Sequence, residues 1–367
     1  MRIAVITGSR ADRGPLGMVH AALIRAGHAV RWIDMEPGLP VIHRSEAVSI
    51  AAITATSVAG DLAAMPTDLV VLLGDRYEIL GAAMGANMMG VPVAHLSGGD
   101  VTEGSADDCY RHAITKLAHL HFPTHEEAAV RIVCMGEDPG RVHNVGCPGI
   151  DRLLAAQLFD RESALRSLSL PATPRLMLVA FHPNTLGGDT AAETAALVTA
   201  LDGLEGTALV IVGPNADPGA DIIDRAFRDF EWRCPAVYER HLDSTTYLSV
   251  MAHADVMVGN SSAGLYEAPS FGTPTLNVGD RQRGRPMAAS VITCEASAEA
   301  IKFWLKRMID GGKPKGGIRN PFGNGHACEK IVSIIGEIND PKALLRKKFY
   351  NVTGLIEDGR ASIDERE

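Results

Sequence analysis

Acidic, basic and imidazole side chains gather in one short stretch of the chain, directly after a predicted buried strand. The apolar run at residues 91–96 has the composition of such a strand, and Gly98-Gly99-Asp100 follows it as a turn. From Asp107 the pattern becomes helical, and the spacing places Arg111 and His112 near the preceding acids on one face. Carboxylates, a guanidinium and an imidazole can together bind an anion and exchange protons. Because ligands of open α/β sheets bind at the carboxyl ends of strands, we predict a catalytic site here, with Asp100, Asp107, Arg111 and His112 as candidates.

Other charged residues near this stretch have two open interpretations. Asp75 and Arg76 follow another predicted strand, so they can contact a ligand, but Asp75 can equally cap the helix that follows. Lys116 and His119 continue the helical pattern, and a solvated helix face is the more common explanation for them.

The first predicted strand and helix, at residues 2–7 and 15–26, enclose a loop that contains arginines. Proline stands at the start of this helix, as expected, and the loop holds Arg10, Asp12 and Arg13. Its spacing is not that of the GxGxxG dinucleotide motif. We therefore expect an anion or transition-state contact in this loop and no NAD site.

A second stretch has the features of a phosphate site. The strand predicted at residues 255–258 ends in a turn from Gly259 to Gly264, and a helix follows. Backbone N–H groups and the hydroxyls of Ser261 and Ser262 would then point to an anion at a positive helix end, while Glu267 could bind ribose hydroxyls one turn later. A serine-capped helix without a ligand is the alternative. It is less favoured because it requires neither the glycines nor Arg281, Arg283 and Arg285 downstream.

Composition limits the class of protein. The chain has 367 residues, of which 46% are hydrophobic, enough for two domains with separate cores. A net charge of −9 argues against a nucleic-acid or membrane partner, and the trio Arg346-Lys347-Lys348 is more simply a helix end. Six scattered cysteines without a CxxC pair favour reduced thiols and no zinc site. No signal peptide begins the chain and no apolar run approaches a membrane span, so we expect a cytoplasmic protein.

Strands and helices alternate along the whole chain, with a break near Pro171 and Pro174 that we interpret as a linker. The expected division is an N-terminal Rossmann-like domain at residues 1–168, a C-terminal Rossmann-like domain at 169–345 and a helix or tail at 346–367. The first domain would carry the reactive groups and the second the phosphate ligands. Two such domains with parallel sheets that face each other across a cleft describe the GT-B-like α/β fold class.

Between Gly8 and about Arg285, an ordered set of motifs resembles the UDP-N-acetylglucosamine 2-epimerases. The likeness is closest to the hydrolysing branch, which makes N-acetylmannosamine for sialic-acid synthesis. The motifs are Gly74-Asp75-Arg76, His95-x-x-Gly98-Gly99-Asp100, Asp107-Asp108-x-x-Arg111-His112-Ala113-Ile114-Thr115-Lys116, His182-Pro183, Gly259-Asn260-Ser261-Ser262 with Glu267, and Gly272-Thr273-Pro274 with Arg281-Gln282-x-Gly284-Arg285.

This resemblance implies roles for the candidate residues. Asp75, Asp107 and Arg111 would line the sugar site, and Asp107 is the first candidate for the base. Some members of the family carry a catalytic glutamate where this chain has Ser97, so Asp75, Asp100 and His112 stay open as further acid or base groups. The substrate- or UDP-binding set comprises Arg10, Arg76, His182, Asn215, Asn260, Ser261, Ser262, Glu267 and Arg281.

The implied reaction converts UDP-N-acetylglucosamine, or a close 2-acetamido relative, into UDP and a free N-acetylmannosamine-type sugar by anti elimination and hydration. No cofactor and no metal is implied, and the family likeness predicts a homodimer or homotetramer. Four alternatives remain: a hydrolysing epimerase of a 2,4-diacetamido-2,4,6-trideoxy sugar nucleotide on the legionaminic-acid route, a non-hydrolysing epimerase, a GT-B glycosyltransferase, and a nucleotide-sugar-binding regulator without catalysis.

Overall fold

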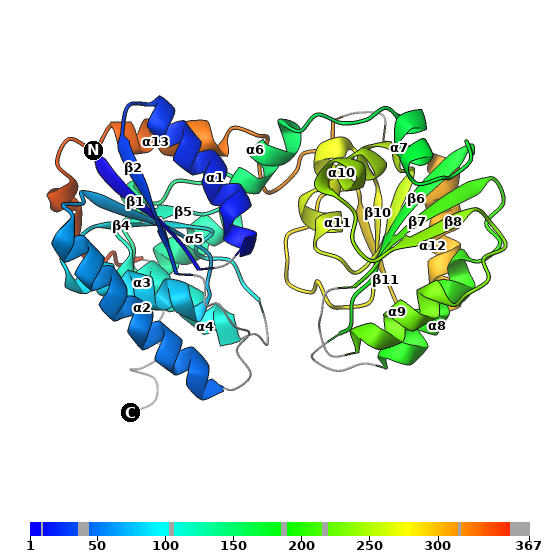
Figure 1. Cartoon of the computed structure of the whole chain (residues 1–367), viewed down its shortest axis with the longest axis horizontal. Helices are drawn as coiled ribbons and strands as arrows, with labels where there is room; N and C mark the ends of the chain where they lie inside the picture. The colour runs from blue at the N-terminus through cyan, green and yellow to red at the C-terminus, as the bar shows by residue number, and fades with distance from the viewer. Residues whose placement is uncertain are drawn as a thin grey trace, which may run out of the picture. The chain divides into compact units, whose positions relative to one another are not determined.

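The chain folds into two compact units in the computed structural model, which describes residues 1–8, 10–35, 44–102, 106–184, 189–214, 219–314 and 317–352. The first unit comprises Met1–Arg152 together with Phe322–Glu367, and the second comprises Leu153–Pro321. Each unit has its own parallel sheet between helices (Figure 1). The predicted α/β class with two Rossmann-like domains is therefore confirmed.

The first sheet has the strand order β2-β1-β3-β4-β5, and its pairings are parallel. Its inner strands are short runs of Val, Ile, Leu and Ala that are buried because helices cover both faces. The strand order changes direction between β1 and β3, which is where open sheets of this kind bind ligands. The strands are β1 (Arg2–Thr7), β2 (Ala29–Asp34), β3 (Leu69–Leu73), β4 (Val93–Leu96) and β5 (Leu120–Phe122).

Helices pack on both faces of this sheet. On one face, α1 (Arg10–Arg25) and α13 (Ala327–Gly336) bury apolar side chains such as Leu16 and Ile331. On the other face lie α2 (Arg44–Ala64), α3 (Tyr77–Met88) and α4 (Ala106–Leu117). Beside β5, a single bridge joins Val142 to His121, and the described residues 142–145 form no strand. Shorter helices complete the segment up to the second unit: α5 (Glu126–Cys134), η1 (Pro139–Arg141) and α6 (Pro148–Leu154).

Helix α2 lies against α3 at very short range. A Cβ atom on Gly81 or Gly85 would overlap the carbonyl oxygens of Ala51 and Ala55, so glycine is required at both positions. One stretch of α2, Glu46–Ala64, has a mean hydropathy of 1.5 and could cross a membrane by length and composition alone. The expectation that no apolar run approaches a membrane span is therefore wrong. Within the fold, α2 contributes Val58 to the core beneath the sheet.

The C-terminal segment is held on the first unit by a buried carboxylate. Glu137 accepts hydrogen bonds from His121, Lys116 and Lys347. Burial alone would raise the pKa of Glu137, but these three donors lower it to about 2. Lys116 thus has a structural partner, and His119 is buried, where its Nδ1 accepts from the Val93 backbone at 3.2 Å. The interpretation as a solvated face is wrong for His119, which is 3% exposed, because sequence spacing does not show what packs against a helix. Lys116 is 41% exposed, so it lies on a solvated face as well as binding Glu137.

The second sheet has the parallel order β11-β10-β9-β6-β7-β8, with its change of direction between β6 and β9. Helices α8, α9 and α12 cover one face, and α7 and α10 cover the other. The strands are β6 (Arg175–Ala180), β7 (Thr207–Val212), β8 (Ala236–Glu239), β9 (Val256–Gly259), β10 (Thr275–Val278) and β11 (Val291–Cys294). The helices are α7 (Arg161–Ser167), α8 (Thr190–Leu201), α9 (Ala220–Arg228), α10 (Ser244–His253), α11 (Ala263–Tyr266), η2 (Ala268–Phe271) and α12 (Ala298–Gly311).

The two units do not have the domain boundaries that we predicted. The boundary placed between residues 168 and 169 lies inside the second unit, and residues 322–345, assigned to the second domain, belong to the first. The reason is helix packing: α7 buries Ala164 and Leu165 in the core of the second unit, and α13 packs on α1. The prolines near residue 171 mark a loop before β6, and the last short helix, η3 (Pro341–Leu345), stays with the first unit.

The contact between α2 and α3 gives a test of the fold. Gly81→Ala should destabilise the protein by about 1–3 kcal/mol, because the added methyl group overpacks the contact with Ala51. Gly60→Ala is the matched control on α2, since nothing lies within 4 Å of a Cβ atom there. It should stabilise the helix by roughly 0.5–1 kcal/mol. The unfolding temperatures of the two variants can be measured by calorimetry. Equal changes relative to the parent protein would contradict the close contact between α2 and α3.

Candidate active site

The guanidinium of Arg111 organises the loops at the carboxyl end of the first sheet. Its side chain is only 7% exposed and forms an ion pair with Asp75, which follows β3. It also donates to Asp108 Oδ1 at 3.2 Å, to the carbonyl oxygen of Asp100 at 2.8 Å and to Thr102 Oγ1 at 3.1 Å. Asp75, Asp100 and Arg111, predicted separately from three segments, are therefore brought together by one buried cation.

Asp107 is the acid in this cluster with the clearest change in proton affinity. Its pKa is raised, first by burial and then by the negative charge of Asp75, while Arg76 and Arg111 act in the opposite direction. A carboxyl group with a raised pKa holds a proton closer to neutral pH, which suits a group that takes up and releases protons. The geometry thus gives Asp107 the properties of an acid or base.

The remaining catalytic candidate, His112, lies on the same helix. Its Nε2 is 3.5 Å from Asp108 Oδ2, and its buried Nδ1 has no hydrogen-bond partner among the described residues. Asp108 also accepts from the backbone N–H of Thr102 at 2.7 Å, so this acid fixes the start of α4. The imidazole is 28% exposed and remains available for a ligand.

The glycines of the Gly98-Gly99 turn serve internal packing. A Cβ atom on Gly98 would lie 2.8 Å from the Nδ1 of buried His95, and one on Gly99 would overlap the carbonyl oxygen of Ala128. Ser97, just before them, has φ of 60°, a left-handed conformation that costs a residue other than glycine about 1–2 kcal/mol. The turn therefore presents Asp100 through tight packing of its glycines.

Arg76 has a partner that the sequence analysis missed. It donates to both carboxylate oxygens of Glu78, at 3.2 and 3.1 Å, and Glu78 is fully buried. This ion pair raises the pKa of the Arg76 guanidinium. Arg76 is 44% exposed, so part of it still faces solvent. Glu78 follows Arg76 by two residues in the sequence. Nothing in the sequence indicates that Glu78 is buried beneath the Arg76 side chain.

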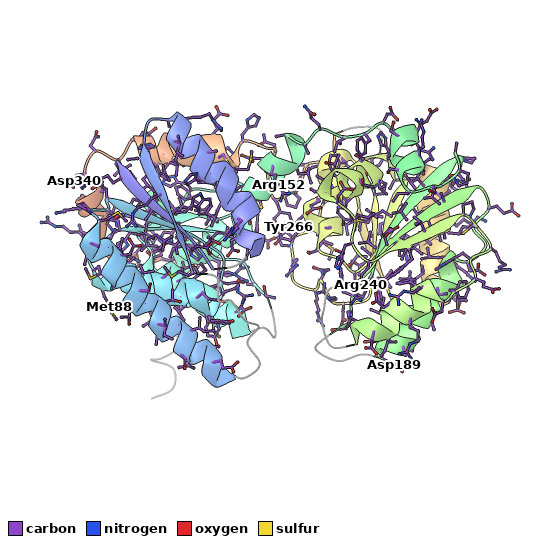
Figure 2. All side chains as sticks on the ribbon, in the orientation of Figure 1. Met88, Arg152, Asp189, Arg240, Tyr266 and Asp340 are labelled. Atoms are coloured by element: carbon purple, nitrogen blue, oxygen red, sulfur yellow. The ribbon has the colours of Figure 1, made fainter. Side chains whose placement is uncertain are left out.

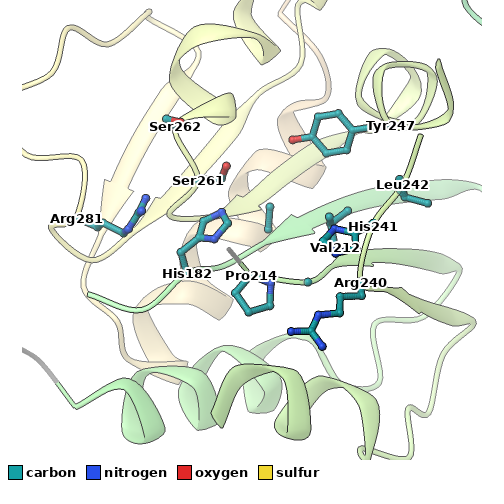
Figure 3. A pocket seen from close by; sticks show the side chains of 12 residues that line it. His182, Val212, Pro214, Arg240, His241, Leu242, Tyr247, Ser261, Ser262 and Arg281 are labelled. Carbon is teal, nitrogen blue, oxygen red and sulfur yellow. The ribbon is translucent and has the colours of Figure 1, made fainter. Parts of the chain in front are cut away.

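The second unit contains a cavity of about 320 Å³ at the carboxyl ends of its strands. Figure 3 shows the side chains of Ser261 and Arg281 and the hydroxyl of Tyr247 directed toward the space above His182. Four of the predicted ligand-binding residues thus line one cavity. Its lining comprises Ala180, His182, Val212, Gly213, Pro214, Arg240, His241, Leu242, Tyr247, Ser261, Ser262 and Arg281.

Asn260 holds the wall of this cavity. Its Oδ1 accepts from the His182 N–H at 2.7 Å, and its Nδ2 donates to the His182 carbonyl at 2.8 Å. The carbonyl of Asn260 in turn accepts from Arg281 at 3.2 Å and from Gln282 at 2.7 Å. The amide of Asn260, which is 2% exposed, is therefore used to join the ends of β6 and β9. Gln282 belongs to the family motif but was given no role, because a buried amide donor resembles any polar loop residue in sequence.

The helix after Ser262 is shorter than the phosphate-site prediction implied. Helix α11 has four residues, so its end offers N–H groups but only a small dipole. Gly259 has φ of 135°, and a Cβ atom there would overlap the Ala180 carbonyl, so glycine is required to bring β9 against β6. The cavity depends on hydroxyls, N–H groups and cations more than on a helix macrodipole.

Several lining residues were not predicted. Arg240, His241, Leu242 and Tyr247 follow β8, and the rule that ligands bind at strand ends could have found them. Burial, and then the charge of Glu267, raises the pKa of Tyr247, so the group stays a hydroxyl donor. Asn215 and the side chain of Arg10 lie outside the described residues.

Comparison with known proteins identifies the family. The family model for UDP-N-acetylglucosamine 2-epimerase matches residues 5–336. The chain belongs to this family. The UDP-N-acetylglucosamine 2-epimerase family resemblance inferred from the motifs is therefore confirmed.

Two curated relatives and one solved structure illustrate the likeness. The GDP/UDP-N,N'-diacetylbacillosamine 2-epimerase (hydrolyzing) of Campylobacter jejuni is 36% identical over 62% of this chain, and the match spans 60% of the relative, less than two-thirds of its length. The UDP-N,N'-diacetylbacillosamine 2-epimerase (hydrolyzing) of Legionella pneumophila is 32% identical over 76% of this chain and 74% of the relative. UDP-GlcNAc 2-epimerase from Neisseria meningitidis has the same fold, with a TM-score of 0.77 at 15% identity over 92% of this chain and all of that one.

Proposed function

We propose that this protein is a hydrolysing 2-epimerase that converts a UDP-linked 2-acetamido sugar into UDP and the free 2-epimeric sugar. The carrying observation is the cluster of Asp75, Asp100 and Asp107 around Arg111 in a member of this epimerase family. A protein that only bound nucleotide sugars would have no reason to hold these carboxylates in the first unit, and the raised pKa of Asp107 supports an acid or base role.

Two sugars are candidates for the substrate. The names of the Campylobacter and Legionella relatives support a 2,4-diacetamido-2,4,6-trideoxy sugar, the type called N,N'-diacetylbacillosamine. The family description, and the Neisseria structure, which was solved with UDP-GlcNAc bound, support UDP-N-acetylglucosamine. Both carry an acetamido group on C2, the carbon at which the configuration changes, so both fit the same chemistry.

The nucleotide is assigned to the cavity of the second unit. Arg281 would place positive charge on the diphosphate, and the His182 ring and the hydroxyls of Ser261 and Ser262 would donate hydrogen bonds to it. Glu267 would accept from the ribose hydroxyls, as the sequence analysis proposed. Preorganised donors of this kind are typically worth about 2.7–4 kcal/mol each to a step in which charge develops. Arg10, Arg76 and Asn215 stay predicted members of the binding set.

The reaction is assigned to the cluster of the first unit. Asp107 takes the proton from C2, the electron pair forms a C1–C2 double bond, and the C1–O bond breaks with its electrons leaving on UDP. Water then adds at C1, and C2 receives a proton on the opposite face, which inverts it. Arg111 keeps Asp75 and the Asp100 loop in position during these steps. Asp75, Asp100 and His112 are the candidates for the second proton transfer, and a well-placed acid or base contributes about 10²- to 10⁴-fold.

We predict that the purified protein, given either UDP-sugar in D₂O, releases UDP and a reducing sugar inverted at C2 that carries deuterium there. The carboxyl proton exchanges with solvent faster than typical turnover of about 1 to 10³ per second, so solvent deuterium reaches C2. NMR of the sugar and an enzymatic UDP assay measure both products. An intact UDP-linked epimer would indicate the non-hydrolysing reaction, and turnover only with an added acceptor would indicate a glycosyltransferase.

Substitutions should separate nucleotide binding from chemistry. His182→Ala and Glu267→Ala should weaken UDP binding, because they remove contacts to the diphosphate and the ribose. Asp107→Asn should leave UDP binding unchanged and lower kcat by about 10²- to 10⁴-fold, since the amide cannot accept the C2 proton. Calorimetric titration with UDP and steady-state rates measure the two effects. Unchanged UDP affinity in both second-unit variants would contradict this division of labour.

We also propose that the protein is a homodimer or homotetramer, as the family likeness predicts. The cytoplasmic location expected from the sequence is a proposal as well. Helix α2 supports assembly, because Val48 and Ile53 are 72% and 67% exposed, and Met88 at the end of α3 is 78% exposed (Figure 2). Ile53→Lys should lower the mass measured by light scattering, whereas Ile222→Lys on the second unit should not. Equal masses for both variants and the parent would exclude α2 as the interface.

A further inference from the structure

His125 lies beneath Asp100 in the first unit and has no role in the assignments above. It is the N-cap residue of α5, where the backbone N–H of Ala128 donates to its Nδ1 at 3.3 Å. The imidazole is 6% exposed, and its ring meets the ring of buried Phe322 edge-on, with centroids 5.7 Å apart. The side chain is therefore fixed by packing on one side and by a backbone donor on the other.

The capping contact determines which nitrogen carries the proton. Because Nδ1 accepts a hydrogen bond, the proton of the neutral ring must be on Nε2. The sequence position alone gives no such information, since the tautomer follows from the neighbour of each ring nitrogen.

The proton on Nε2 points to the carboxylate of Asp100. The Nε2–Oδ1 distance is 2.9 Å, and Thr124 Oγ1 donates to the same oxygen at 3.4 Å. The carboxylate is 17% exposed, and no donor among the described residues contacts its Oδ2 atom. One oxygen is thus held by the fold, and the other is left for a ligand or a water molecule.

The main chain on both sides of Asp100 is fixed as well. Arg111 donates to the Asp100 carbonyl at 2.8 Å, and Arg131 of α5 donates to the Gly99 carbonyl. With the main chain fixed, the Asp100 side chain can still rotate about its own bonds. The hydrogen bond from His125 prevents this rotation. A carboxylate that must meet a reacting carbon gains rate from such orientation.

From this geometry we propose that His125 is a positioning residue that orients Asp100 for proton transfer to or from the substrate or its attacking water. The inference rests on the proposed epimerase function. It adds an Asp100–His125 pair to the site, in which the histidine donates from Nε2 and does not itself exchange protons with the substrate. Asp100, and not His125, is the group that touches the reacting atoms.

Two variants separate the two functions of the imidazole. Asparagine is among the best N-cap residues but does not reach Asp100, so His125→Asn should keep the unfolding temperature and lower kcat by about 10- to 100-fold, with KM changed less than about twofold. Glutamine places a donor at the distance of Nε2 but caps poorly. His125→Gln should therefore be less stable than His125→Asn and yet turn over faster.

A double-mutant cycle tests whether His125 acts through Asp100. If it does, Asp100→Asn combined with His125→Asn should be no slower than Asp100→Asn alone. A purely structural role would lower the rate of the double variant further. Full kcat in His125→Asn, or additive losses in the double variant, would overturn the proposal.

Nitrogen NMR of the imidazole tests the arrangement without turnover. The parent should show a protonated Nε2 and an unprotonated Nδ1, and Asp100→Asn should shift the Nε2 signal. A proton on Nδ1 would overturn the proposal even in an active enzyme. If the parent released no UDP from either sugar, the epimerase assignment would fail, and the NMR result would still decide the Asp100–His125 pair.

Discussion

The buried guanidinium of Arg111 is the constraint on which the first site depends. A cation that is 7% exposed is costly unless charged and polar groups surround it, and here those groups come from the ends of β3 and β4 and from α4. The segments that follow two strands must therefore close around one side chain of α4. The same closure places Asp107 where burial and the charge of Asp75 raise its pKa.

In the second unit, mainly neutral groups hold the strand ends together. The ends of β6 and β9 are joined by the amide of Asn260 and the backbone of His182, and Gln282 adds a further neutral donor. Two cations also line the cavity: Arg281 donates to the Asn260 carbonyl, and Arg240 forms an ion pair with Asp224 at 3.5 Å. Such a cavity suits an anionic ligand, since the positive charge faces the space to be filled.

The glycines near both sites have the same physical basis. Gly99 and Gly259 adopt positive φ angles, and a side chain on either would overlap a backbone carbonyl, of Ala128 and Ala180 respectively. Glycine is needed there because main chains approach one another, and the polar groups beside the glycines then face the ligand. Ser97 accepts a left-handed conformation without being glycine, which fits a strand end that is held tightly by its neighbours.

Local pattern was enough to predict the α/β class, most strands, and the strand ends that carry chemistry, because apolar runs and turn residues act over a few positions. It also predicted, through the general rule for parallel sheets, that Asp100, Asp107 and Arg111 belong to one site, whereas Asp75 was placed there by the family resemblance. Tertiary structure decided the rest. The unit boundaries follow from where α7 and α13 pack, and His119 proved structural because of what covers it. The roles of Glu78, His125 and Gln282 depend on partners that are near in space and on burial that no single-sequence pattern encodes.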